Sequence, residues 1–197
     1  MDRTFNYERA YTMGCTFDPF LEAAKAHREL WHAVAARTSP PPEEVDRLRK
    51  LPGRWRLLAI ADDWCGDAVD VLPVAARLAE SSHGVEFRIV GREVWPELMD
   101  RHLTGGSRSV PVIILLDEAG RCRGWWGPRP SELQAWFESE GRSLPKEERF
   151  RLTRRWHARN RGATVARELV DLVACAALPG EVGCDGTRRR CAEGVAA

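Results

Sequence analysis

The residues best suited to chemistry lie in one short segment, 63–68, which reads Asp-Trp-Cys-Gly-Asp-Ala. It follows an apolar run that ends at Ala61, and it precedes a segment rich in Ala, Val and Leu that predicts a helix from Gly66 to about Glu80. Cys65 would then lie at the N-terminus of that helix, where unsatisfied backbone N–H groups and the helix dipole favour an anion. A thiolate, rather than a thiol, attacks disulfide bonds. The segment therefore predicts thiol–disulfide chemistry at Cys65.

The chain has five other cysteines. We interpret Cys15 and Cys122 as inert. The remaining three lie near the C-terminal end: Cys175, Cys184 and Cys191. They can resolve a disulfide on Cys65 or bind a metal ion with His157, but their spacing matches no zinc site. We therefore expect free thiols there, and neither a metal nor another cofactor.

The composition points to no charge-dependent partner. The 197 residues carry 30 basic and 29 acidic side chains, and a net charge of +1 indicates neither nucleic acid nor an anionic membrane as a partner. An arginine-rich run at 149–161 can bind phosphates, but we interpret it as the solvated face of a helix. No apolar run approaches the roughly 20 residues of a membrane span, and residues 1–5 show no secretion signal. We expect a reduced, cytoplasmic protein.

Apolar runs separated by turn residues predict an α/β fold. The predicted strands are residues 55–61, 85–90, 110–116 and 121–126, with a hairpin turn at 117–120. The predicted helices are 18–34, with Asp18 as N-cap, 43–50, 66–80, 95–103, 130–138 and 163–177. A helical crossover joins parallel strands and a hairpin adds antiparallel ones, so this order predicts a central mixed sheet of four to five strands flanked by helices.

Four features within residues 54–138 resemble the thioredoxin-like superfamily. The segment 64–66, Trp-Cys-Gly, follows a strand, and Pro73 stands eight residues after the cysteine, where thioredoxins carry a helix-kinking proline. The segment 109–111, Ser-Val-Pro, opens an apolar strand where thioredoxins carry their cis-proline, and the hairpin ends at Gly127. The strings Asp-Trp-Cys-Gly-Asp-Ala, Arg-Ser-x-Pro and Trp-Gly-Pro-Arg resemble a less studied bacterial branch of small thioredoxin-like proteins.

The resemblance implies a thioredoxin-like fold with Cys65 as the catalytic residue. It also implies a cis Val110–Pro111 bond, which would leave an extended backbone edge beside the sulfur where a substrate segment can pair. Gly66 lets the backbone turn closely at the thiol, and Trp64 supplies an apolar platform over it. We therefore expect Trp64, Gly66, Val110 and Pro111 to bind substrate.

The segment departs from the thioredoxin pattern in two ways. Ala68 stands where thioredoxins have the second cysteine, and Ala59 stands where they have a buried acid that moves protons. Three aspartates lie close to the thiol instead: Asp62, Asp63 and Asp67. Like charge opposes ionisation, so we expect Cys65 to be less acidic than in relatives. Its chemistry should be monothiol chemistry.

These observations divide the chain into four segments. We expect an N-terminal helical extension packed on the fold at 1–53, a thioredoxin-like core at 54–140, C-terminal helices at 141–178 and a disordered tail at 179–197.

The leading hypothesis is a monothiol thiol–disulfide oxidoreductase in cell redox homeostasis. Its partners would be a protein or low-molecular-weight disulfide and an external thiol reductant, with neither nucleic acid nor a membrane. The alternative is a non-catalytic protein that binds a partner through a groove between Trp64 and Pro111, because a fold does not fix a function.

Overall fold

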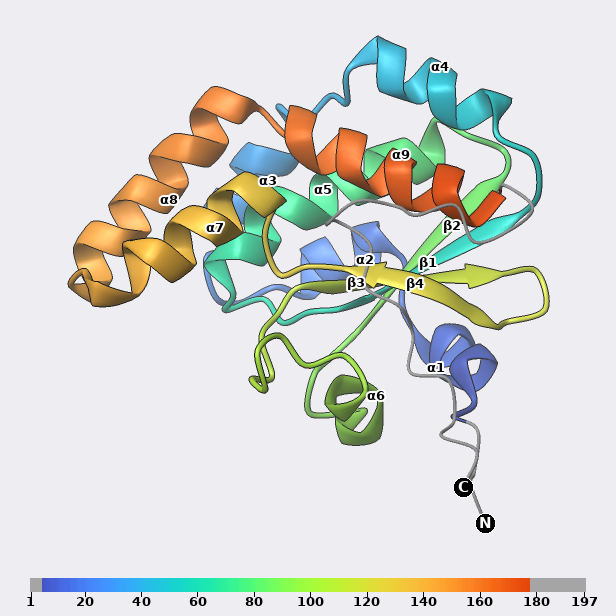
Figure 1. The fold of residues 1–197 in the computed structure, drawn as a ribbon, viewed down its shortest axis with the longest axis horizontal. Coiled ribbons are helices and arrows are strands. Elements are labelled where there is room, and N and C mark those ends of the chain that lie inside the picture. Colours follow the sequence, from blue (N-terminus) through green and yellow to red (C-terminus); the bar gives the residue numbers. More distant parts are fainter. Residues whose placement is uncertain (1–4, 178–197) are drawn as a thin grey trace.

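Four strands form one mixed sheet in a computed structural model that describes residues 5–177 (Figure 1). The strands are β1 (Trp55–Ile60), β2 (Val85–Val90), β3 (Val112–Asp117) and β4 (Cys122–Trp126), and they lie in the order β2-β1-β3-β4. β1 runs parallel to β2 and antiparallel to β3, which pairs with β4 through the predicted hairpin. The predicted tail at 179–197 lies outside the described residues.

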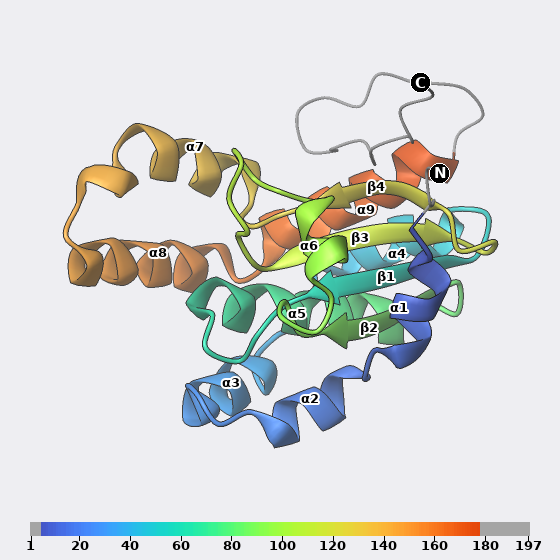
Figure 2. The same cartoon turned by 90° about the horizontal axis from the view of Figure 1, so that it is seen from below.

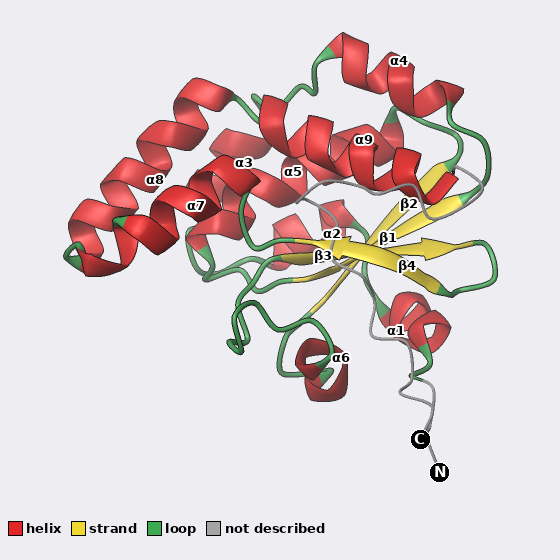
Figure 3. Ribbon diagram, viewed as in Figure 1, coloured by secondary structure: helices red, strands yellow, loops and turns green. Residues whose placement is uncertain are grey.

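Helices cover both faces of this sheet. The described helices are α1 (Tyr7–Met13), α2 (Phe17–Ala23), α3 (Arg28–Ala35), α4 (Pro42–Lys50), α5 (Gly66–Glu80), α6 (Pro96–Asp100), α7 (Ser131–Ser139), α8 (Lys146–Asn160) and α9 (Ala163–Ala177), with a short 3-10 turn at Gly141–Ser143. α4, α5 and α9 lie on one face and α1 and α6 on the other (Figures 1 and 2), and Figure 3 shows the sheet between these layers. The predicted α/β fold, with additional helices at each end, is confirmed.

The N-terminal region differs from the prediction. A single helix from residue 18 to residue 34 is wrong, because the chain forms α2 and α3 with a break between them, and α2 begins after Thr16 rather than after Asp18. The carboxylate of Asp63 accepts hydrogen bonds from the backbone N–H groups of Lys25 and Ala26 at 2.7 and 2.9 Å. These N–H groups therefore bond to a distant side chain rather than to carbonyls of a continuous helix.

The same break ties the N-terminal helices to the segment that carries the thiol. Trp31 on α3 is fully buried, and its indole N–H donates to the backbone carbonyl of Asp63 at 2.9 Å. Asp63 is thus held by its carboxylate and by its carbonyl. Because Asp63 is two residues from Cys65, α2 and α3 help to fix the position of the thiol.

A buried glutamate joins the C-terminal helix to the sheet. Glu168 on α9 is only 2% exposed. Its carboxylate accepts hydrogen bonds from the indole N–H of Trp126 at 2.6 Å and from the hydroxyl of Ser131 at 2.6 Å. Trp126 ends β4 and Ser131 begins α7, so this one side chain fixes the segment between them.

Gly127, within that segment, has no room for a side chain. Its φ is +131°, and an added Cβ would lie 2.3 Å from the carbonyl oxygen of Pro111. We expect Gly127→Ala to lower the free energy of unfolding by about 3 kcal/mol, because it combines backbone strain with overpacking against a main-chain atom. Urea denaturation measures this. A loss below about 0.5 kcal/mol, the size of an ordinary surface substitution, would contradict the assigned packing.

Candidate functional site

Cys65 lies at the start of α5, as predicted. It is the N-cap residue of the helix and is only 7% exposed. Its Sγ donates a hydrogen bond to the carbonyl oxygen of Val110 at 3.2 Å, and the predicted cis bond between Val110 and Pro111 is present. The fold therefore brings two segments 45 residues apart into contact at the thiol.

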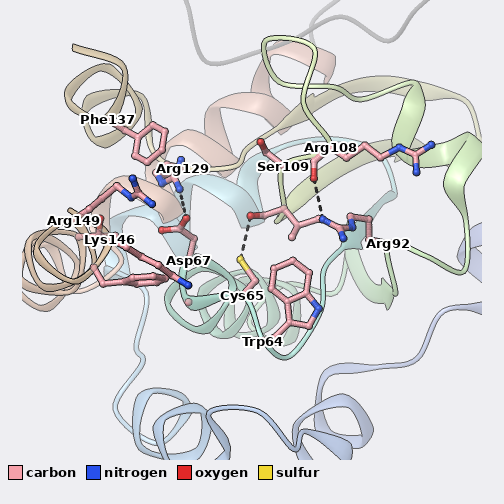
Figure 4. A pocket seen from close by; sticks show the side chains of 14 residues that line it. Trp64, Cys65, Asp67, Arg92, Arg108, Ser109, Arg129, Phe137, Lys146 and Arg149 are labelled. Carbon is pink, nitrogen blue, oxygen red and sulfur yellow. Dashed lines mark hydrogen bonds and ion pairs between the residues drawn. The ribbon is translucent and has the colours of Figure 1, made fainter. Parts of the chain in front are cut away.

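A pocket of about 410 Å³ opens beside the thiol (Figure 4). Of the residues predicted to bind substrate, Trp64, Gly66 and Val110 line it together with Cys65. Trp64 is 49% exposed, so its ring forms part of the accessible rim. Pro111 is buried and does not line the pocket. In the loop that contains Val110 and Pro111, Cys65 faces the carbonyl group of Val110.

Burial raises the pKa of Cys65 to about 11. The negative charge of Asp67 contributes to this rise, whereas the backbone N–H groups of Asp67 and Ala68 and the guanidinium of Arg129 act in the opposite direction. The hydrogen bond to the carbonyl of Val110 also favours the neutral thiol, because only the thiol has a proton to donate. At neutral pH the resting state is therefore a protonated, hydrogen-bonded thiol.

The expected rise in the pKa of Cys65 is confirmed, but two of the three nearby aspartates do not act as predicted. Asp63 bonds to the backbone before α3, and Asp62 accepts a hydrogen bond from the backbone N–H of Arg92 at 3.3 Å. Asp67 is the aspartate that raises the pKa of Cys65, and desolvation exceeds its effect. The sequence could not show that burial dominates.

Asp67 forms an ion pair with Arg129 at 2.6 Å, with exposed side-chain fractions of 11% and 16%. Burial raises the pKa of Asp67, and Arg129 opposes that rise. The guanidinium also stacks over the ring of Phe137, 3.9 Å from its centroid. The two strings noted in the sequence, 63–68 and Trp-Gly-Pro-Arg at 126–129, are thus joined by this ion pair beside the thiol.

Helix α8 forms one wall of the pocket. Lys146, Arg149, Phe150 and Thr153 line it, at the i, i+3, i+4 and i+7 spacing of a single helix face. Phe150 packs closely on Gly66, since a Cβ added to Gly66 would lie 3.2 Å from its ring. Sequence reasoning missed this wall, although the helical spacing of these four residues was a usable signal.

The arginine-rich run is not simply a solvated helix face. Arg149 lines the pocket, and Arg154 pairs with the carboxylate of Asp70 on α5 at 2.6 Å. Burial raises the pKa of Asp70 to about 7, and Arg154 opposes that shift. The ion pair between Arg154 and Asp70 attaches α8 to α5, the helix that begins after Cys65. The exposed Arg151, which lies 3.6 Å from Glu148, fits the original interpretation.

The cysteines also differ from expectation. Cys122 and Cys175 each take part in a disulfide bond, so the prediction of a free thiol at Cys175 is wrong, and Cys122, interpreted as inert, is not a free thiol. These disulfide bonds contradict the expectation of a fully reduced protein. Cys15 and Cys65 are the free thiols within residues 5–177. Cys184, like Cys191, lies outside the described residues.

Two further properties concern the described residues only. They contain no group of three or more His, Cys, Asp or Glu side chains that could hold a metal ion. His157, considered as a ligand, is buried on α8, and burial lowers its pKa to about 3. No helix in the described part of the chain is long and apolar enough to cross a membrane.

A family model described as thioredoxin matches residues 14–143, which is more than half of the chain. The chain belongs to the thioredoxin family. A crystal structure of a protein of unknown function from Pseudomonas aeruginosa is similar, with a TM-score of 0.70 and 17% identity over 88% of this chain and 100% of that one. An HIV epitope-scaffold is also similar, with a TM-score of 0.67 and 16% identity over 86% of this chain and 98% of that one. Comparison with curated proteins gives no match.

The family match ends before α8 begins at Lys146. The thioredoxin segment therefore contributes Cys65, its neighbours and the loop at Val110. The wall carried by α8 comes from a segment outside the match. The pocket therefore combines residues of the thioredoxin-family segment with one wall from a helix outside the family match.

Proposed function

We propose that this thioredoxin-family protein is a monothiol thiol–disulfide oxidoreductase acting through Cys65. The observation that carries the proposal is a free thiol at a helix N-terminus, next to the loop at Val110 and open to a pocket. The residue at position 68, where a resolving cysteine would stand, is a fully buried alanine. A second thiol must then come from outside the segment.

The reaction has two exchange steps. A base in solution removes the Cys65 proton, and the thiolate attacks one sulfur of a disulfide R–S–S–R′, forming Cys65–S–S–R and releasing R′–S⁻. An external thiolate R″–S⁻ then attacks sulfur R of the mixed disulfide, forming R–S–S–R″ and returning the Cys65 thiolate. The backbone N–H groups of Asp67 and Ala68 and the guanidinium of Arg129 stabilise that anion.

The proposal predicts a mixed disulfide on Cys65 that an external thiol removes. The full-length protein is incubated with a small disulfide at pH 9, digested without reductant and mapped by mass spectrometry. We expect one adduct on Cys65, its loss after addition of a thiol, and its absence in Cys65→Ser. Cys15→Ser is the control that excludes the second free thiol. An unmodified Cys65 under conditions that modify Cys15 would reject the proposal.

The non-catalytic alternative has one observation in its favour, which is the burial of a protonated Cys65. A protein that only binds a partner in this groove needs no thiolate. The two functions separate in Cys65→Ser, which should lose capture of disulfide partners from a lysate in the first case and keep its partners in the second.

A further inference from the structure

The pocket beside Cys65 has a marked excess of positive charge. Among the described residues that line it, one is a carboxylate, Asp67, and five are cationic: Arg92, Arg108, Arg129, Lys146 and Arg149. Figure 4 shows Arg129, Lys146 and Arg149 on one side of the thiol, with Arg92 and Arg108 on the other.

The cations on the Trp64 side are already neutralised by carboxylates outside the pocket. Arg92 pairs with Glu93 at 2.8 Å. Arg108 binds both carboxylate oxygens of Asp100 at 2.7 Å. This side of the pocket therefore offers little net charge to a ligand.

The opposite side has two cations, Lys146 and Arg149, that form no close ion pair with a described residue, although Arg149 interacts with Asp67 at longer range. Arg129 is paired with Asp67, but Lys146 and Arg149 have no carboxylate within 4.0 Å among residues 5–177. Each lies near an aromatic ring instead, with the Lys146 Nζ 5.9 Å from the ring centroid of Phe150 and the Arg149 guanidinium 5.6 Å from that of Phe137. Their hydrogen-bond donors are available to a ligand.

A buried donor lies in the same region. The Nε of Arg129 is buried and has no acceptor among the described residues. The side chain is held by Asp67 and by the ring of Phe137, so this donor is fixed in position. A buried donor without a partner is costly unless a ligand or water supplies the acceptor.

We propose that this pocket selects small disulfides that carry a carboxylate, with the carboxylate bound by Lys146 and Arg149 and a sulfur presented to Cys65. The inference rests on the proposed function and names its substrate class. A volume of about 410 Å³ is suited to a small molecule. Phe137 and Phe150 provide apolar walls for the stem that joins the carboxylate to the sulfur.

The test compares three small disulfides of different charge: dithiodipropionate, which is anionic, hydroxyethyl disulfide, which is neutral, and cystamine, which is cationic. The rate of mixed-disulfide formation on Cys65 is measured for each by mass spectrometry in the Cys15→Ser background. Each rate is divided by the rate of the same disulfide with a small free thiol, because the pKa of the leaving thiol also differs among the three. On this scale we expect the anionic compound to react fastest and the cationic one slowest. Added salt should reduce this difference, because it screens charges at a partly open site.

The decisive variant is Lys146→Gln/Arg149→Gln. Its anionic-to-neutral rate ratio should fall about tenfold, because two charged hydrogen-bond donors are lost. The ratio is the readout because a change in the pKa of Cys65 alters both rates equally. The control, Arg151→Gln/Arg155→Gln, removes the same charge from exposed positions of α8 and should leave the ratio unchanged.

An equal ratio in the wild type and in the pocket variant would overturn the inference while leaving the proposed function intact. If Cys65 reacts with none of the three disulfides, the proposed function fails, and calorimetry of dithiodipropionate with Cys65→Ser tests the pocket separately. Binding that is lost in the pocket variant would support the inference, and no binding would reject it. Reaction with disulfides of acidic peptides but not with the small anion would reject the small-molecule substrate.

Discussion

Alkylation of Cys65 should be slow at neutral pH and should accelerate about tenfold for each pH unit up to pH 11. Its pKa is raised to about 11, mainly by burial. A thiol ionises as pH rises, so about one molecule in ten thousand carries the thiolate at pH 7, compared with about 3% for an unperturbed cysteine. Only the thiolate reacts. The rate at pH 7 should therefore be more than a hundredfold below that of an unperturbed thiol.

The measurement is the rate of iodoacetamide addition to Cys65 between pH 6 and pH 11, read by mass spectrometry in the full-length Cys15→Ser protein. Hydrogen–deuterium exchange over the same range confirms that the fold persists. A rate that levels off below pH 8.5 would show an activated thiolate and would contradict the described burial of the sulfur.

Asp67→Asn should lower the pKa of Cys65 and so restore part of its reactivity at neutral pH. Asp67 raises the pKa of Cys65, and its removal also leaves the guanidinium of Arg129 without its carboxylate. Both changes favour the anion, so we expect about a tenfold faster alkylation at pH 7. Arg129→Gln is the opposite control and should slow the reaction. Slower alkylation in Asp67→Asn would contradict the assigned electrostatics.

Ala68→Cys should convert the protein into a dithiol oxidoreductase. We expect little wild-type activity in insulin reduction with a dithiol reductant, and an increase of at least about tenfold in the variant. Residues 65 and 68 stand at the N-cap and in the first turn of α5. Side chains three apart on a helix are neighbours, within the Cα separation that a disulfide needs. The new thiol can therefore release a substrate held on Cys65.

Ala68→Ser is the matched control because it adds a group of similar size without a thiol. Residue 68 is fully buried, so both variants should be destabilised to a similar extent, and denaturation curves correct for this. Turnover by the wild type at the rate of Ala68→Cys would show that another thiol already resolves the mixed disulfide. That result would reject the hypothesis of a monothiol mechanism.

The sequence alone was sufficient to predict the fold class and the place of the thiol. The apolar runs at 55–61 and 85–90 are local signals, and they became β1 and β2. The helix predicted at 66–80 became α5, with Cys65 as its N-cap. Strand and helix periodicity depend on residues close together in the sequence, so such elements can be predicted without the tertiary structure.

The sequence could not show where helices end when a distant side chain intervenes. α2 and α3 are separate because Asp63 binds backbone groups about 37 residues earlier in the chain. The start signal at Asp18 and Pro19 and the apolar periodicity that continues to Val34 favour an uninterrupted helix and contain no information about that contact. A tertiary hydrogen bond to the backbone outweighs the small free energies of helix propensity.

The electrostatic character of the site was decided by the tertiary structure. Three aspartates near Cys65 in sequence suggested one crowded cluster, but the fold directs Asp63 to the backbone between α2 and α3 and pairs Asp67 with Arg129. The pKa of the thiol depends mainly on how much water surrounds it, and burial is a property of the packed chain. The pocket wall on α8 likewise depends on the packing of that helix against α5, where Arg154 pairs with Asp70. The sequence determined which groups are available for chemistry, and packing decided which of them reach the sulfur.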